Sequence, residues 1–243
     1  MTAGQPWSFA APGAPAPAPS PSPSPAPAPA PAPATVPVLP ALRELLPRGG
    51  LARGSVVAVA EFGLLCLALA TAASADGAWC AIAGIPEAGV LAAAALGLDA
   101  GRILLVPEPG PSWPQVVASL LDGCELVLLR PPARAPSPVR QRLEATLRRG
   151  RGVLLVAGDW PGAQLRLRVV TQRWTGLGHG HGRLRACCAE VAADGRGAAA
   201  GMRTRWLWLP GEDGGVAVAD PGDLPFDVLA DPGTAPARYA VSG

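Results

Sequence analysis

The sequence contains no lysine, and all 20 of its basic residues are arginines. A phosphate-binding P-loop has the motif G-x-x-x-x-G-K-[ST], in which backbone N–H groups surround the phosphates and the lysine reaches the outer ones. An apolar strand is expected at Val56–Ala60, followed by a helix over Gly63–Ala75, and the junction holds one glycine and no hydroxyl side chain. ATP hydrolysis at an ordinary P-loop is therefore excluded there, which favours a binding or assembly function over an enzyme.

Aromatic residues make up only 5% of the chain, so the volume of the core has to come from alanine, leucine and valine. The five cysteines have neither metal-ligand nor disulfide spacing. Cys66, Cys80 and Cys124 lie in apolar runs, and Cys187 and Cys188 are adjacent in an expected strand. We expect buried, reduced thiols in a cytoplasmic protein. The first residues also lack the basic and apolar segments of a secretory signal.

The sequence gives little support for a membrane span or for a metal site. Val56–Ala73 is close to membrane-spanning length, but Glu61 interrupts it and no basic cluster or aromatic belt flanks it. We interpret it as a buried strand followed by a packed helix, with no membrane partner. His179 and His181 could bind a metal together with Cys187 or Cys188, but no third ligand follows at a recognisable spacing. No metal, cofactor or catalytic triad is predicted.

Composition divides the chain into three regions. Residues 1–40 are mostly alternating proline with alanine or serine, which favours an extended disordered tail, with Trp7 and Phe9 as the only possible docking anchors. Residues 41–210 are expected to form one α/β domain. Residues 211–243 are polar and rich in glycine and proline, and are expected to be a loosely ordered tail.

Within the central region, short apolar strands alternate with helices. The expected strands after Val56–Ala60 are Trp79–Ala83, Arg102–Val106, Glu125–Leu129 and Val153–Ala157. The expected helices after the first are one from Pro86 to Gly97, Trp113–Leu121 and Ser137–Gly150. Gln164–Gln172, Arg183–Val191 and Arg203–Leu209 then follow as strands without helices between them. This order predicts a mostly parallel sheet flanked by helices, with an antiparallel C-terminal extension.

The same order resembles the RecA-like ATPase core. Leu51–Val57 resembles the G-[LI]-P-x-G-x-[IV]-[VT] entry of RecA proteins, and Ala94–Leu105 resembles their A-x-x-L-G-[VL]-D-x-x-x-[LI]-L run. The resemblance implies an aspartate that positions magnesium at the end of the Glu125–Leu129 strand, where this chain has Arg130. It also implies a catalytic glutamate near Glu87, one residue out of register. Both halves of a RecA-like nucleotide site are therefore expected to be degenerate.

Three segments narrow the resemblance to the actinobacterial ImuA-prime type, an accessory of mutagenic translesion synthesis. They are Arg130-Pro131-Pro132, Gly158–Gly162, and Arg173–Gly178 running on to Arg185. The resemblance implies a non-catalytic protein that binds an ImuB-type Y-family polymerase homologue and an error-prone C-family polymerase after DNA damage. The alternatives are a RecA-like regulator that binds DNA or the recombinase, and a cell-division inhibitor of the SulA type.

Positive charge is concentrated in one part of the chain. Residues 134–185 contain eleven arginines against Glu144 and Asp159, whereas residues 51–129 contain two arginines against seven acidic residues. Such a segment suits phosphates or an acidic protein surface, through planar bidentate contacts. It could equally pair with the acidic parts of the same chain. The residues expected to contact DNA or a partner are Arg166, Arg168, Arg173, Arg183 and Arg185.

Overall fold

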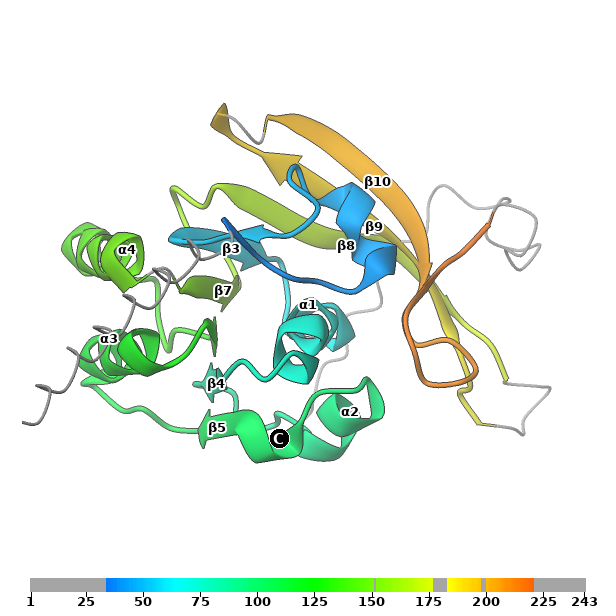
Figure 1. The fold of residues 1–243 in the computed structure, drawn as a ribbon, viewed down its shortest axis with the longest axis horizontal. Coiled ribbons are helices and arrows are strands. Elements are labelled where there is room, and N and C mark those ends of the chain that lie inside the picture. Colours follow the sequence, from blue (N-terminus) through cyan, green and yellow to red (C-terminus); the bar gives the residue numbers. More distant parts are fainter. Residues whose placement is uncertain (1–33, 151, 177–182, 198–199, 221–243) are drawn as a thin grey trace, which may run out of the picture. The chain divides into compact units, whose positions relative to one another are not determined.

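A nine-stranded sheet in the order β11-β10-β9-β8-β3-β7-β6-β4-β5 forms the centre of the fold (Figure 1). The computed structural model describes residues 34–150, 152–176, 183–197 and 200–220. The parallel strands are β3 (Ser55–Val59), β4 (Cys80–Ala83), β5 (Ile103–Val106), β6 (Leu126–Leu129) and β7 (Val153–Ala157). The extension consists of β8 (Leu165–Trp174), β9 (Cys187–Gly195), β10 (Gly201–Trp208) and β11 (Ala217–Val218).

Helices cover both faces of the parallel part. They are α1 (Leu64–Ala75), α2 (Val90–Ala95), α3 (Trp113–Gly123) and α4 (Ser137–Gly150), with short 3-10 helices η1 (Pro40–Leu45) and η2 (Ala100–Arg102). Successive strand residues point to opposite faces. Val57 and Val59 therefore pack in the cluster that contains α1, whereas Val56 and Ala58 pack in the cluster that contains α3 and α4. All five residues of β3 are buried, as expected for a strand covered on both sides.

The expected architecture is confirmed as a mostly parallel sheet flanked by helices with an antiparallel extension. β8 pairs parallel with β3 and antiparallel with β9, and β10 continues the antiparallel order. The helix expected between Pro86 and Gly97 is shorter, because residues 85–88 form a turn in which the Ala88 N–H bonds the Ile85 carbonyl. The strand expected at Arg183–Val191 begins only at Cys187.

The ordered fold is longer at both ends than the sequence predicts. Thr35–Val36 (β1) pairs antiparallel with Leu51–Ala52 (β2), and Val36 is buried. The boundary expected at residue 40 is therefore wrong, because apolar residues interrupt the Pro/Ala alternation from Val36 onward, and Val36 and Val38 bury against the core. At the other end, β11 pairs with β10 and Ala219 is buried, so the expected loosely ordered tail does not begin at 211. Residues 1–33 and 221–243 lie outside the described ranges.

The N-terminal segment is joined to the far end of the sheet. Leu42 and Leu45 of η1 are fully buried in the core that also contains Leu207 of β10. Beside them, the Arg205 side chain of β10 donates through Nε to the Glu44 carboxylate at 2.7 Å, and the two side chains form an ion pair. Residues at the start and near the end of the described chain therefore share one contact region.

All five cysteines are buried and unpaired, as the sequence predicts. Burial raises the pKa of Cys66 to about 11, and it raises the pKa of both Cys80 and Cys187 to about 12. These thiols are protonated at neutral pH and act as small apolar core residues.

The helix that follows β3 is also a core element, and among the described residues no helix has both the length and the hydrophobicity to cross a membrane.

Gly84, directly after β4, allows two strand ends to approach closely. Its φ is +71°, and a Cβ there would lie 2.2 Å from the carbonyl oxygen of Arg130, the residue after β6. The Arg130 N–H bonds the Ala83 carbonyl at 3.0 Å, so the two strand ends are held together at this point. A side chain at position 84 would push them apart.

We predict that Gly84→Ala lowers the free energy of unfolding by about 3 kcal/mol, from left-handed strain together with the clash. Gly110→Ala is the matched control, because Gly110 also has a positive φ, +64°, but a Cβ there meets nothing within 4 Å. It should cost only about 1 kcal/mol. Urea unfolding of both variants measures the difference, and equal losses would contradict the close approach at Gly84.

Candidate functional site

The carboxyl ends of the parallel strands, next to β3, are where an open α/β sheet usually binds a ligand. From β3 the chain crosses through α1 to β4 on one side, and β8 later pairs on the other side of β3. Ligands in such sheets bind outside the carboxyl ends of the strands, where the strand order reverses. The loops that follow β3, β4, β6 and β7 therefore define the candidate site.

The loop after β3 is too short to surround a phosphate. It consists of residues 60–63 only, between the end of β3 at Val59 and the start of α1 at Leu64. The Gly63 carbonyl accepts the Cys66 N–H at 3.0 Å, and the Cys66 thiol donates to the Glu61 carbonyl at 3.5 Å. This loop has one glycine and no lysine or hydroxyl side chain, so it cannot provide the ligands of a P-loop.

Arg130 and Glu87 meet at the same edge. Arg130 follows β6 and Glu87 lies in the turn after β4, and the Arg130 Nη1 donates a hydrogen bond to Glu87 Oε1 in an ion pair. The Arg130 guanidinium also lies over the Phe62 ring, 5.5 Å from its centroid, in a cation–π contact. Arg130 thus contacts the loops after both β3 and β4 from the end of β6.

This arrangement pairs the Glu87 carboxylate with a cation. A guanidinium occupies the position at the end of β6, and it neutralises the glutamate that follows β4. The side chains of Arg130 and Glu87 are 37% and 54% exposed, so the pair is a surface feature of the edge and not a buried core interaction.

The pKa of Glu87 is held below its ordinary value, first by a backbone hydrogen bond to its carboxylate and then by the hydrogen bond from Arg130. A lowered carboxyl pKa means that the pair is intact above the ordinary glutamate range. It is lost only when the pH falls through the depressed pKa.

We predict that Arg130→Gln raises the pKa of Glu87 only part of the way to its ordinary value, because the backbone hydrogen bond remains. NMR titration of the Glu87 carboxyl carbon measures the shift. Arg134→Gln is the control, since Arg134 is exposed and follows the same strand. An unchanged Glu87 pKa in Arg130→Gln would show that the two side chains do not pair in solution.

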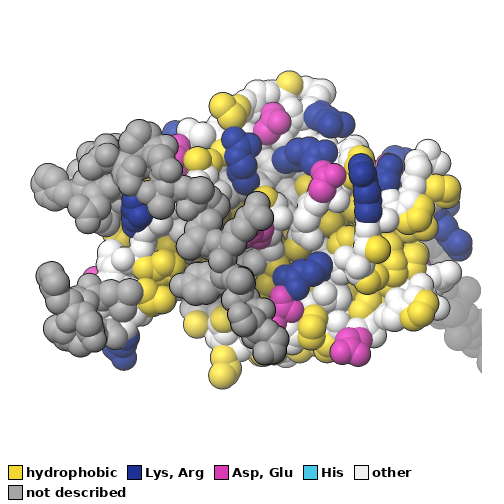
Figure 2. All heavy atoms as spheres, turned by 180° about the vertical axis from the view of Figure 1, so that it is seen from behind, with side chains coloured by type: hydrophobic (Ala, Val, Ile, Leu, Met, Phe, Trp, Pro, Cys, Tyr) yellow, Lys and Arg dark blue, Asp and Glu magenta, His cyan; other side chains and the backbone are white. Residues whose placement is uncertain are grey.

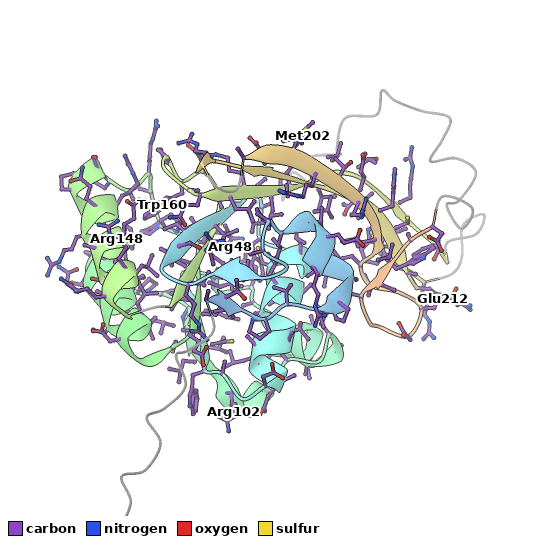
Figure 3. All side chains as sticks on the ribbon, turned by 45° about the horizontal axis from the view of Figure 1, so that its top comes forward. Arg48, Arg102, Arg148, Trp160, Met202 and Glu212 are labelled. Atoms are coloured by element: carbon purple, nitrogen blue, oxygen red, sulfur yellow. The ribbon has the colours of Figure 1, made fainter. Side chains whose placement is uncertain are left out.

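The segment after β7, residues 158–162, lies beside the carboxyl end of β3. The Gly158 N–H donates to the Val59 carbonyl at 2.7 Å, which fixes this loop to the end of β3. Trp160 is 1% exposed, and its Nε1 donates to Glu144 of α4 at 3.3 Å (Figure 3). The Gly158–Gly162 motif therefore has a structural role here: its tryptophan fills the core between the sheet and α4.

Arg166 is tied to this same segment. Its Nη1 donates to Asp159 at 2.9 Å and its Nη2 donates to the Trp160 carbonyl at 3.1 Å. Of the arginines predicted to contact DNA or a partner, Arg166 is thus engaged within the chain. Its alternation with buried Leu165 and Leu167 is as expected.

The structure brings three of the predicted arginines to one face of β8. Arg166, Arg168 and Arg173 lie opposite Asp194, Ala192 and Cys188 of β9. Simple alternation would place Arg173 on the other face from Arg166 and Arg168, but a bulge between Val169 and Thr171 shifts the register by one residue. Arg183 and Arg185 lie before β9, where the Arg185 N–H donates to the Thr175 carbonyl just after β8, and they line a shallow surface depression with Leu184 and Glu212.

The arginine-bearing face is not uniformly basic. Glu190 and Asp194 of β9 lie opposite Thr171 and Arg166, and Trp206 of β10 lies opposite Glu190. Figure 2 shows dark-blue arginine side chains interspersed with magenta carboxylates across the upper part of the view. The sequence could not reveal this mixture, because the acidic residues come from a different strand from the arginines.

The described residues contain no group of three or more His, Cys, Asp or Glu side chains that could hold a metal ion. His179 and His181, the residues considered for a metal site, lie outside the described ranges. Phe62 is the site residue that sequence reasoning missed, because nothing in its local spacing distinguishes it from other apolar residues. Trp160 was noted only as part of the Gly158–Gly162 segment, and its buried position was not predicted.

The fold and the site define an α/β protein with an exposed ion pair, Arg130 with Glu87, at the carboxyl ends of its parallel strands. Residues 44–162 match the family model of the MT3502 N-terminal domain. This range contains Phe62, Glu87, Arg130 and Trp160, whereas β8–β11 lie beyond it.

A curated relative is the "Uncharacterized protein Rv3395c" of Mycobacterium tuberculosis. It is 34% identical over 128 residues, which cover 51% of this chain and 63% of the relative. The chain therefore matches less than two thirds of that protein's length. The name of this relative assigns no activity to it.

Proposed function

We propose that this chain is a non-catalytic accessory subunit of DNA-damage-induced translesion synthesis, built on a RecA-like domain whose nucleotide site is degenerate. The observation that carries the proposal is the contact of Arg130 with both Glu87 and Phe62 at the carboxyl edge of the sheet. Through it, the positions that the RecA resemblance assigns to the magnesium ligand and the catalytic glutamate neutralise each other. The short loop at residues 60–63 supports the same conclusion independently.

The central sheet has a complete buried core. β3 and β7 are buried along their whole lengths, and helices cover both faces. A protein that has this core but lacks the groups for ATP chemistry is best understood as a binding protein. Its function would then depend on surfaces that bind other proteins. By resemblance, the partners are an ImuB-type Y-family polymerase homologue and an error-prone C-family polymerase.

A second candidate function is a RecA-like regulator that binds DNA or a recombinase. The observation that favours it is the shared face of Arg166, Arg168 and Arg173 on β8. The interleaved Glu190 and Asp194, together with the bonds of Arg166 within the chain, weigh against an uninterrupted phosphate-binding track. We therefore place it second.

We predict that ATP binds no more tightly than about 1 mM, an affinity of about 4 kcal/mol, with no magnesium-dependent turnover. Isothermal titration measures the affinity. Arg130→Asp, which returns a carboxylate to the end of β6, should not restore binding, because the loop at residues 60–63 still lacks P-loop ligands. Micromolar ATP affinity in the unmodified chain would contradict a degenerate site.

We further predict that the full chain co-purifies with the ImuB-type homologue without ATP and after nuclease treatment. Loss of the chain should abolish damage-induced mutation and leave undamaged growth unchanged. Arg166→Ala with Arg168→Ala should leave the co-purification intact if protein contacts dominate. If no polymerase component binds and loss of the chain alters septation instead, the SulA-type alternative is correct.

A further inference from the structure

The exposed side of α4 carries positive charge that is not paired within the described part of the chain. Arg142, Arg148 and Arg149 of α4 are exposed, and so is Arg134, which precedes the helix. Among the described residues, none of these four side chains forms an ion pair. Their guanidinium groups are therefore available to a ligand from solution.

Few acidic residues lie near this surface. Glu144 is the one acidic residue of α4, and it accepts the Nε1 hydrogen bond of Trp160 at 3.3 Å. The neighbouring helix α3 packs against α4, and its only charged residue is Asp122. The α4 surface is therefore strongly basic, unlike the β8 face, where Glu190 and Asp194 lie among the arginines.

The helical period sets the arrangement of these charges. The two buried leucines of α4 face the sheet, so Ala145 lies at the centre of the side that faces away from it. Arg142 and Arg149 are two turns apart on one flank of Ala145, and Arg148 lies on the other flank (Figure 3 labels Arg148). Because alanine is small, a ligand that lies along the helix can contact guanidinium groups on both flanks.

The segment before α4 is fixed to the helix, which holds Arg134 at its first turn. The Arg140 Nη1 donates to the Ala135 carbonyl at 2.6 Å, and the Arg140 N–H bonds the Pro136 carbonyl at 3.1 Å. Ala135 itself is 4% exposed. Arg140 is therefore a positioning residue for this segment and does not belong to the exposed group.

The exposed residues of α4 favour a nucleic acid over a protein as the ligand. They are Ser137, Pro138, Gln141, Arg142, Arg148, Arg149 and Gly150. None of them is aromatic or a large aliphatic residue, the types that anchor the centre of a protein–protein interface. Guanidinium groups bind phosphates through planar, charge-assisted hydrogen bonds and need no apolar anchor. The surface therefore suits a phosphate backbone.

The lack of aromatic residues also distinguishes a duplex from a single strand. Proteins that bind single strands stack the bases on aromatic side chains beside a basic groove. Residues 131–150 contain no aromatic side chain. A duplex keeps its bases stacked and presents its phosphates outward, so positive charge alone is enough to bind it.

We propose that the exposed side of α4 binds the phosphate backbone of duplex DNA. Arg142 and Arg149 contact phosphates on one flank of Ala145, Arg148 contacts them on the other, and Arg134 adds a fourth contact. Phosphate contacts carry no sequence information, so the binding has no sequence preference. This surface differs from the five arginines that the sequence predicts to contact DNA. The inference rests on neither the polymerase partner nor the degenerate nucleotide site.

Fluorescence anisotropy of a short fluorescein-labelled DNA duplex, titrated with the full chain at several salt concentrations, tests the proposal. Four phosphate contacts predict that log affinity falls against log salt with a slope of about −3.5. Arg142→Gln with Arg149→Gln removes two contacts, so the slope should become about −2 and binding at low salt should weaken at least about tenfold. Circular dichroism confirms that the variant is folded.

Arg183→Gln with Arg185→Gln is the matched control, because it removes the same charge from two exposed residues. These residues lie before β9, on a segment across the molecule from α4 (Figure 1). They are also among the residues that the sequence predicts to contact DNA. The slope and the affinity of this variant should match those of the unmodified chain.

Salt-insensitive binding, or no binding at low salt, would overturn the proposal. An equal loss in the control variant would overturn the location on α4, and tighter binding of a single strand of the same length would overturn the assignment to duplex DNA. The Arg142→Gln, Arg149→Gln variant should still co-purify with the ImuB-type homologue. If it loses that homologue and keeps its affinity for DNA, α4 contacts a protein and the proposal is wrong. The ATP titration does not depend on any of these results.

Discussion

Burial of β3 on both faces is the constraint on which the rest of the structure depends. Its five residues are buried, and β7 and β8 pair on its two sides. Each aliphatic side chain fully buried here contributes about 1.5–3 kcal/mol to folding. A strand placed in this way requires a helical layer on each face, so it determines where α1, α3 and α4 lie. It also brings the ends of its neighbours to a common edge.

At that edge, converging strand ends meet loops that carry a paired charge. The strand ends still converge, and the tight approach at Gly84 still holds β4 and β6 together. Their loops provide a guanidinium, a paired glutamate and an aromatic ring, which contact one another at this point.

Much of the fold could be predicted because the signals are local. Alternating apolar strands and capped helices gave the element order, and Ser137–Gly150 is a helix with the predicted bounds. The missed features depend on contacts between distant residues. Arg130 and Glu87 are 43 positions apart, and no local pattern couples them.

The bulge in β8 and the short β1 escaped prediction for related reasons. Alternation assigns a face to Arg173 only if the strand is regular, and the bulge becomes visible only from its pairing with β9. Thr35–Val36 is too short to be distinguished from a tail until β2 is seen beside it. In the site, the resemblance drew attention to Arg130 and Glu87 separately, whereas their contact with each other was not predicted.

The contact of Glu44 with Arg205 has a consequence for how the chain is made. These residues are 161 positions apart, and Leu42 and Leu45 bury in the same region as Leu207. During synthesis from the N-terminus, the η1 segment leaves the ribosome long before β10 exists. Its leucines stay without their final partner until almost the whole described chain has been translated. Completion of this fold is therefore a late event, governed by the last strands to emerge.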